Sequence, residues 1–241
     1  IIKLPRISNF SDLDPFFSES SIQMRWVEPE KEIGSPDILI IPGSKQTIKD
    51  LEILNKTGMS KQIRNYAKNG GTIFGICGGL QMLGETLEDP HKKESLNEKS
   101  HLSYNGINLL PIKTIFGEIK HTSQREEIVS WPEKRTVKGF EMHYGESDLI
   151  NKENSDIISL FSDTSLGWVI EKEDKSFIGG TYLHGIFENQ EWRLQLINRI
   201  RQKKGFNKLN NSERNKTDQR ERLLDLLTDT FEKYIDIEKV I

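Results

Sequence analysis

The first 90 residues alternate between short apolar runs and stretches with the spacing of an amphipathic helix. Residues 37–54 contain an apolar run, a Pro-Gly-Ser break and a helical pattern, and residues 60–71 form a second helical pattern that ends in two glycines. Residues 72–76 are almost entirely apolar, and a helical pattern returns at 80–87. Alternation at these lengths predicts parallel βαβ units, and the apolar strands indicate a sheet covered on both faces.

Shorter strand patterns follow beyond residue 90, and two more precede the βαβ region. The later ones lie at about 107–116, 118–124, 137–143 and 166–170, and the early ones at 1–4 and 22–28. We therefore expect one α/β domain over residues 1–200.

Residues 201–241 have a different pattern. Residues 201–222 hold eight Lys or Arg against three Asp or Glu, which favours a solvated connector over a binding patch. Apolar positions at 224, 227, 231 and 234/235 then share one helical face. We expect a polar connector followed by a C-terminal helix that packs on the same domain.

Composition narrows the class of protein. Of 241 residues, 34% are hydrophobic and 29% are charged, with a formal net charge of −3, which is typical of a globular chain with one core. Neither a nucleic-acid partner nor a membrane partner is expected, because there is no strong basic excess and no apolar stretch near ~18 residues. A single cysteine excludes an internal disulfide framework and favours a reducing, cytoplasmic compartment.

The only cysteine, Cys77, lies between an apolar run and two glycines, in the sequence GGTIFGICGGLQMLG. A strand that ends in a cysteine and turns sharply into a helix is the pattern of a nucleophile elbow, where the neighbouring side chains must be small. The N–H groups at the start of that helix favour a thiolate and can stabilise an oxyanion. A buried, inert cysteine is the alternative interpretation.

A cysteine nucleophile needs a proton acceptor. Of the five histidines, His143 in GFEMHYGES and His184 in GGTYLHGIF lie beside strand patterns. His184 follows a short strand, and active sites of open α/β sheets gather at strand ends. Gly43, in IIPGSKQT, follows another strand and could give a second oxyanion donor. The full Walker pattern is absent around Lys45, which argues against nucleotide binding there.

Together these motifs resemble the class I, or triad, glutamine amidotransferases, in which G-x-C-x-G-x-Q carries the nucleophile. Here the motif reads GICGGLQ. The blocks LPRISNFSDLDPF, PGSKQTIKDL, GINLLPIKT, GFEMHYGES and GTYLHGIFEN are similar, in the same order, to the glutaminase half of the cobyric acid synthase family. The resemblance covers about residues 3–200. It implies a flavodoxin-like, open and mostly parallel sheet with helices on both faces.

The resemblance also implies an activity and partners. This family amidates peripheral carboxylates of the corrin ring in cobalamin biosynthesis, with glutamine as the nitrogen donor. An ATP-dependent synthetase half precedes the glutaminase half, and ATP and Mg²⁺ are expected there; no metal or other cofactor is expected in this chain. The chain begins with Ile1 rather than Met, so we expect it to be a piece of a longer polypeptide whose synthetase domain is its partner.

Site roles carry over from the resemblance to matching positions. Cys77 would be the nucleophile and His184 the base and later the acid. The remaining assignments are the oxyanion hole at the Gly43 and Gly78 N–H groups and a glutamine site lined by Gln81, Glu141 and His143.

One position departs from the class I pattern. Many members have a glutamate two residues after the histidine, where this chain has Ile186. Glu188, four residues after His184, is a possible third member of a triad, but the turn at Gly185 could carry it away from the site. We favour a Cys–His dyad, or a histidine oriented by another group.

Other functions compatible with the motifs form three classes. The first is a related amidotransferase, such as cobyrinic acid a,c-diamide synthase or a cell-wall glutaminase subunit. The second is a cysteine hydrolase of the same fold that transfers no ammonia. The third is a non-catalytic interaction module that keeps the elbow only as structure. The LPRISNFSDLDPF block favours the cobyric acid synthase family.

Overall fold

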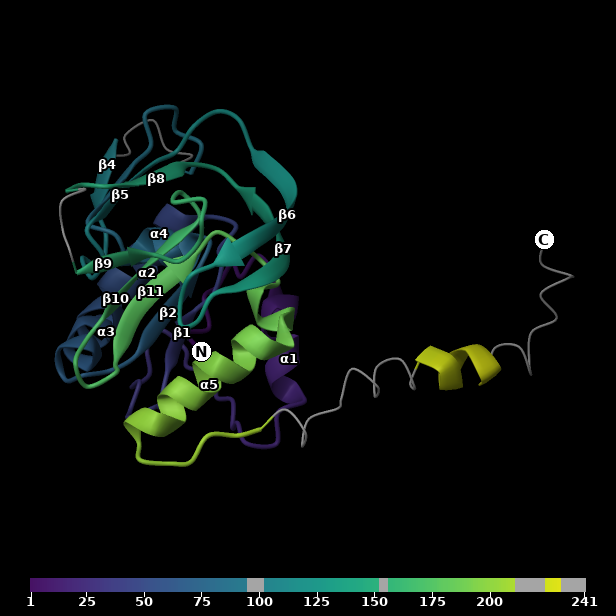
Figure 1. Cartoon of the computed structure of the whole chain (residues 1–241). Coiled ribbons are helices and arrows are strands. Elements are labelled where there is room, and N and C mark those ends of the chain that lie inside the picture. Colours follow the sequence, from purple (N-terminus) through teal and green to yellow (C-terminus); the bar gives the residue numbers. More distant parts are fainter. Residues whose placement is uncertain (95–101, 152–155, 211–223, 231–241) are drawn as a thin grey trace, which may run out of the picture. The chain divides into compact units, whose positions relative to one another are not determined.

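The computed structural model describes residues 1–94, 102–151, 156–210 and 224–230 (Figure 1). The chain divides into two compact units, Ile1–Asn207 and Lys208–Ile241. All the labelled strands and helices belong to the first unit. In the described part of the chain, none of the helices is both long and apolar enough to cross a bilayer.

The first unit is built on a five-stranded sheet with the order β1-β2-β11-β10-β9. Its strands are β1 (Leu39–Ile41), β2 (Ile73–Ile76), β11 (Phe177–Thr181), β10 (Gly167–Glu171) and β9 (Ile157–Ser159). β1, β2 and β11 run parallel, whereas β10 and β9 pair antiparallel at one edge. The predicted α/β architecture is confirmed, with a sheet that is mixed in direction.

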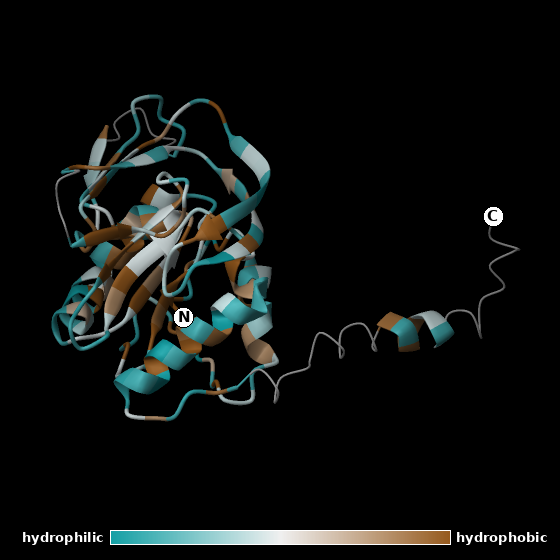
Figure 2. Ribbon diagram, in the orientation of Figure 1, coloured by the Kyte–Doolittle hydropathy of each residue, from teal (hydrophilic) through white to brown (hydrophobic). Residues whose placement is uncertain are grey.

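Helices cover both faces of this sheet. α2 (Thr47–Lys56), α3 (Met59–Lys68) and α4 (Gly78–Leu83) lie on one face and α5 (Gln190–Lys203) on the other (Figure 1). Successive residues of β2 face opposite sides of the sheet, and each side meets a helix. The centroid of the Phe74 ring lies 5.8 Å from that of the Trp192 ring of α5. Gly75 faces the backbone of α4. Figure 2 shows the apolar residues concentrated on the central strands, with mostly hydrophilic residues on the outer side of α5.

A second layer lies beside the carboxyl ends of the parallel strands. It contains a four-stranded sheet with the order β4-β3-β5-β8 and a separate ribbon of β6 and β7. The bounds are β3 (Thr86–Glu88), β4 (Ser103–Asn105), β5 (Ile112–Ile115), β8 (Glu146–Leu149), β6 (His121–Val129) and β7 (Arg135–His143). The ribbon reaches the central sheet through a bridge between Phe140 and His184.

Short helical turns complete the unit near its N-terminus and after β11. They are η1 (Phe10–Leu13), α1 (Asp14–Phe17) and η2 (Ile186–Glu188). The η1 and η2 turns contact each other. This contact brings the N-terminal segment to the carboxyl end of β11.

Several expectations were wrong in detail. The predicted strands at 1–4 and 22–28 meet only through one parallel bridge, between Ile2 and Val27. The helix expected at 80–87 begins at Gly78 and ends at Leu83, because β3 takes up the following residues. α5 was not predicted, although Trp192, Leu196 and Ile200 have the spacing of one helical face.

The second unit is described only in part. Residues 224–230 are helical, within the region where the sequence predicts a C-terminal helix. Residues 211–223, which include much of the basic stretch 201–222, and residues 231–241 lie outside the described residues. The division at residue 200 and the packing of the C-terminal helix on the domain stay predictions.

Candidate active site

Cys77 occupies a sharp turn between β2 and α4. Its backbone has φ +48° and ψ −108°, a region that a residue with a Cβ rarely adopts and that concentrates at functional sites. The Cys77 N–H donates to the Thr181 carbonyl at 2.7 Å, which ties the turn to the end of β11. The side chain is 5% exposed. This is the geometry of a nucleophile elbow.

Glycines around the elbow allow α4 to lie directly against the strand ends. A Cβ on Gly79 would overlap the carbonyl oxygen of Ile41 at the end of β1. A Cβ on Gly75 would lie 2.6 Å from the Gly79 backbone, and one on Gly78 would lie 2.9 Å from the Ser44 nitrogen. The glycines beside the cysteine are therefore required by close packing of backbone on backbone.

His184 follows β11 and is 0% exposed. Its Nδ1 donates to Oδ2 of Asp12 at 2.7 Å, and Asp12 is itself 2% exposed. The other carboxylate oxygen of Asp12 accepts from the Gly185 N–H at 2.9 Å. The Phe140 ring lies nearly parallel to the imidazole, with centroids 5.1 Å apart. A buried carboxylate and a stacked ring thus fix the orientation of the histidine.

The charge state of His184 follows from these neighbours. Burial lowers the pKa of His184, but hydrogen bonds and charge interactions with Asp12 and Cys77 outweigh burial and raise that pKa to about 10. With Nδ1 held by Asp12, Nε2 is the nitrogen left to act on sulfur. The imidazolium form of His184 is the one that these interactions favour.

Gly43 lies against both Cys77 and His184. A Cβ at this position would lie 3.4 Å from Cε1 of His184 and 3.6 Å from the Cβ of Cys77. Gly78 is the first residue of α4, and N–H groups in the first turn of a helix have no acceptor within it. The structure therefore brings together four residues predicted from the sequence, Gly43, Cys77, Gly78 and His184.

Gln81 is buried and its amide is bonded within the protein. Its Nε2 donates to the Tyr144 carbonyl at 2.9 Å and to the Tyr182 hydroxyl at 3.2 Å, and its Oε1 accepts from Thr47 Oγ1 at 3.1 Å. These bonds use both amide protons and tie α4 to the strand layer above it. Contact of Gln81 with glutamine stays a prediction.

Glu141 is held by residues of its own ribbon. It accepts from Arg125 Nε at 2.7 Å and from Ser123 Oγ at 3.0 Å. Burial raises the pKa of Glu141, but hydrogen bonds from His143, Arg125 and Ser123 outweigh burial and lower the pKa to about 2. Glu141 is therefore an anion at any working pH, already paired with a cation.

His143 is the last residue of β7. Its Nδ1 is 2.9 Å from the Gly145 carbonyl oxygen, and its ring stacks on Tyr182 with centroids 4.0 Å apart. Between Glu141 and His143, the Met142 carbonyl accepts from the Cys77 thiol at 3.9 Å. The segment thus borders Cys77, while binding of glutamine by Glu141 or His143 stays a prediction.

The group that orients His184 was missed by sequence reasoning. Among the described residues, Asp12 is the carboxylate that hydrogen-bonds the ring, and Glu188, the possible third member, does not hold that place. The Glu188 N–H donates to the Gly185 carbonyl, and Glu188 is exposed whereas the His184 ring is buried. A signal was present, since Asp12 lies in the LPRISNFSDLDPF block, but nothing in that block indicates its distant partner.

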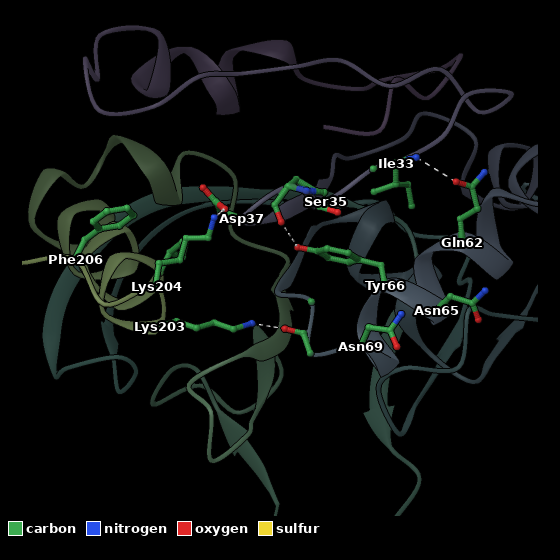
Figure 3. A pocket seen from close by; sticks show the side chains of 15 residues that line it. Ile33, Ser35, Asp37, Gln62, Asn65, Tyr66, Asn69, Lys203, Lys204 and Phe206 are labelled. Atoms are coloured by element: carbon green, nitrogen blue, oxygen red, sulfur yellow. Dashed lines mark hydrogen bonds and ion pairs between the residues drawn. The ribbon is translucent and has the colours of Figure 1, made fainter.

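A pocket of about 810 Å³ lies elsewhere, at the amino ends of β1 and β2. In Figure 3 several of its polar side chains bond to neighbours: the Tyr66 hydroxyl donates to the Pro36 carbonyl at 3.0 Å, and Lys204 pairs with Asp37. Neither Cys77 nor His184 lines it. Across the residues that the structure describes, no three His, Cys, Asp or Glu side chains are grouped so that they could hold a metal ion.

The sheet and the elbow define the class I glutamine amidotransferase fold. Comparison with solved structures agrees: the chain matches a glutamine amidotransferase with a TM-score of 0.60 over 85% of this chain and 97% of that one, at 14% identity. It also matches the structure of PurLQS from Thermotoga maritima, with a TM-score of 0.54 over 84% of this chain and 94% of that one, at 14% identity.

Sequence comparison identifies one family within this fold. Residues 1–192 match the model of the CobB/CobQ-like glutamine amidotransferase domain, and the chain belongs to this family. Over its whole length it is 75% identical to a cobyric acid synthase from Prochlorococcus marinus strain NATL1A, and the match covers 49% of that protein. It is also 42% identical to a cobyric acid synthase from Synechococcus sp. strain CC9605, and this match covers 47% of that protein. The chain therefore spans about half the length of the curated relatives it matches.

Proposed function

We propose that this chain is the glutaminase part of a cobyric acid synthase. It hydrolyses glutamine to glutamate and ammonia, and the ammonia serves ATP-dependent amidation of corrin-ring carboxylates in the cytoplasm. One observation carries the proposal: Cys77, at a strained strand-to-helix turn, lies beside a histidine whose Nδ1 is held by buried Asp12. The relatives' names supply the acceptor class.

The geometry supports the following reaction. The Cys77 thiolate attacks the carboxamide carbon of glutamine, and the oxygen of that group becomes an oxyanion near the Gly43 and Gly78 N–H groups. The carbon–nitrogen bond then breaks, and the His184 imidazolium gives its Nε2 proton to the leaving nitrogen, which departs as ammonia. Water, activated by the neutral His184, adds to the thioester, and glutamate leaves with the thiolate restored.

Asp12 has a defined part in these steps. It keeps the Nδ1 proton on His184, so that Nε2 can accept and return a proton on the side of the sulfur. It also stabilises the imidazolium that each cycle forms. Asp12, His184 and Cys77 would therefore work as a triad in which the carboxylate comes from the N-terminal segment.

The rival functions have less support. The relatives named above are cobyric acid synthases, rather than a,c-diamide synthases or cell-wall glutaminases. A hydrolase without ammonia transfer does not account for relatives of twice this length. ATP and Mg²⁺ would be bound by the part of the polypeptide that supplies the synthetase activity.

The test is Cys77→Ala in the full natural polypeptide. We expect glutamine-dependent amidation to be abolished and ammonia-dependent amidation to persist, because free ammonia bypasses the glutaminase site. Glutamate release and corrin amidation are measured separately. Glutamate release that survives the substitution would contradict the nucleophile, and loss of both activities in a folded variant would contradict the division of labour.

A further inference from the structure

A second polar side chain of the N-terminal segment reaches the reactive pair. The segment around Ser8 pairs with the loop after β1: the Ser8 N–H donates to the Gly43 carbonyl at 3.0 Å, and the Lys45 N–H donates to the Arg6 carbonyl at 2.8 Å. Ile7 and Ser44 form a bridge between these bonds. Backbone pairing therefore fixes Ser8 directly beside Gly43.

The Ser8 hydroxyl faces the space between the catalytic groups. A Cβ built on Gly43 would overlap Ser8 Oγ, and it would also lie 3.4 Å from His184 Cε1 and 3.6 Å from the Cys77 Cβ. One point is thus bordered by the serine oxygen, the imidazole and the nucleophile. Glycine at position 43 leaves this point open.

The hydroxyl has no hydrogen-bond partner among the described residues, although its oxygen is shielded from solvent. Buried polar groups are nearly always paired, because an unpaired one loses its bonds to water without replacement. Exceptions gather at functional sites, where a ligand supplies the partner. The position of Ser8 indicates that this ligand is glutamine, since the carboxamide of glutamine must lie between Cys77 and His184.

We propose that Ser8 is a catalytic residue of the glutaminase reaction. Its hydroxyl donates a hydrogen bond to the carboxamide oxygen of glutamine as that oxygen becomes an oxyanion, beside the Gly43 and Gly78 N–H groups. The oxygen, rather than the leaving nitrogen, is the acceptor, because the nitrogen must face Nε2 of His184 to receive its proton. The assignment rests on the proposed glutaminase function.

This role makes opposite predictions for stability and for rate. A hydroxyl that only supports the fold would have a partner in the free protein, and its removal would destabilise the fold. An unpaired hydroxyl that waits for the oxyanion costs nothing to remove from the free protein, whereas its loss slows the reaction. Ser60 is a matched control, because its hydroxyl is also buried and unpaired among the described residues but lies on α3, away from Cys77.

The experiment compares Ser8→Ala and Ser60→Ala with the unmodified protein, each as the full natural polypeptide. For Ser8→Ala we expect kcat and kcat/KM for glutamate release to fall together by about 100-fold, the effect of losing one oxyanion donor, with KM nearly unchanged. The melting temperature should be equal or higher, and ammonia-dependent amidation should be unchanged. Ser60→Ala should leave both rates unchanged.

A second measurement uses glutamate γ-semialdehyde, which adds to the thiolate and places an oxyanion in the same hole. Its inhibition constant should rise about as much as kcat/KM falls in Ser8→Ala and should not change in Ser60→Ala. Unchanged kcat, an effect confined to KM, or a lowered melting temperature in Ser8→Ala would overturn the role of Ser8 alone. An unmodified protein that releases no glutamate would overturn the glutaminase function, and the role of Ser8 with it.

Discussion

Replacing Asp12 by asparagine tests the triad at the residue that the sequence motifs did not reveal. The carboxylate accepts from His184 Nδ1 at 2.7 Å and from the Gly185 N–H at 2.9 Å. Asparagine keeps nearly the same volume, and its oxygen can still accept from Gly185. Its NH₂ group then meets Nδ1, which must become an acceptor, so the ring proton moves to Nε2, facing Cys77.

The magnitude follows from that tautomer. A histidine with its proton on Nε2 cannot take the thiol proton, and the same substitution in serine-protease triads lowers kcat about 10⁴-fold. Loss of the negative charge also removes an interaction that raises the pKa of His184 to about 10. We expect glutaminase kcat/KM in Asp12→Asn to fall by about 10³- to 10⁴-fold, and its alkaline limb to move to lower pH.

Stability gives an independent readout with a definite sign. The folded pKa of His184, about 10, lies above its ordinary value of 6.5. Protonated His184 therefore stabilises the unmodified protein fully below about pH 6.5, and this contribution is lost as the pH rises through about 10. The free energy of unfolding should depend less on pH over that window in Asp12→Asn.

Glu188→Gln is the control for the same reaction. Glu188 lies four residues from the histidine but is not the carboxylate on Nδ1, so its substitution should change kcat/KM little. A variant Asp12→Asn with near-normal activity and an unshifted alkaline limb would refute the triad. A large loss of activity in Glu188→Gln would identify Glu188 as the third member of the triad.

Two further predictions concern stability. Gly79→Ala should destabilise the fold by about 3 kcal/mol, the upper end for overpacking, because the new Cβ overlaps the Ile41 carbonyl oxygen. Thermal denaturation measures this effect, and Gly117→Ala, whose new Cβ meets open space, is the control. Glu94→Gln should raise the melting temperature at pH 8 more than at pH 4, because burial, with help from nearby Asp89 and Asp50, raises the pKa of Glu94 to about 7. A carboxyl with a raised folded pKa loses stability as the pH rises from its ordinary value of 4.5 through about 7, and equal effects at both pH values would contradict this reasoning.

The parts of the site that the sequence predicted are those with a local cause. Cys77 follows an apolar strand and precedes glycines, so residues adjacent in sequence determine both the turn and its tight packing. Gly43 and His184 likewise follow strands whose carboxyl ends meet at one edge of a parallel sheet. The rule that places strand ends together made these residues candidates, and the family resemblance then assigned their roles.

The parts that were missed depend on contacts between distant segments. Asp12 and His184 are 172 positions apart, and no periodicity or spacing reports such a pair. The strand patterns at 1–4 and 22–28 were misjudged for the same reason. Apolar alternation shows which residues are buried, but whether a segment forms a ladder depends on the neighbour available to it, and here that is a single bridge.

The N-terminal segment links these observations. Asp12 hydrogen-bonds His184, and Ser8, four positions earlier, lies against Gly43 beside Cys77. The segment is held by backbone pairing with the loop after β1 and by Arg6, which pairs with buried Asp50 of α2 at 2.9 Å. Cys77 and His184 follow parallel strands, but Asp12 and Ser8, to which we assign the orientation of the histidine and the stabilisation of the oxyanion, come from a loop docked on those strands. Catalytic competence should therefore depend on that docking, even where the sheet itself is intact.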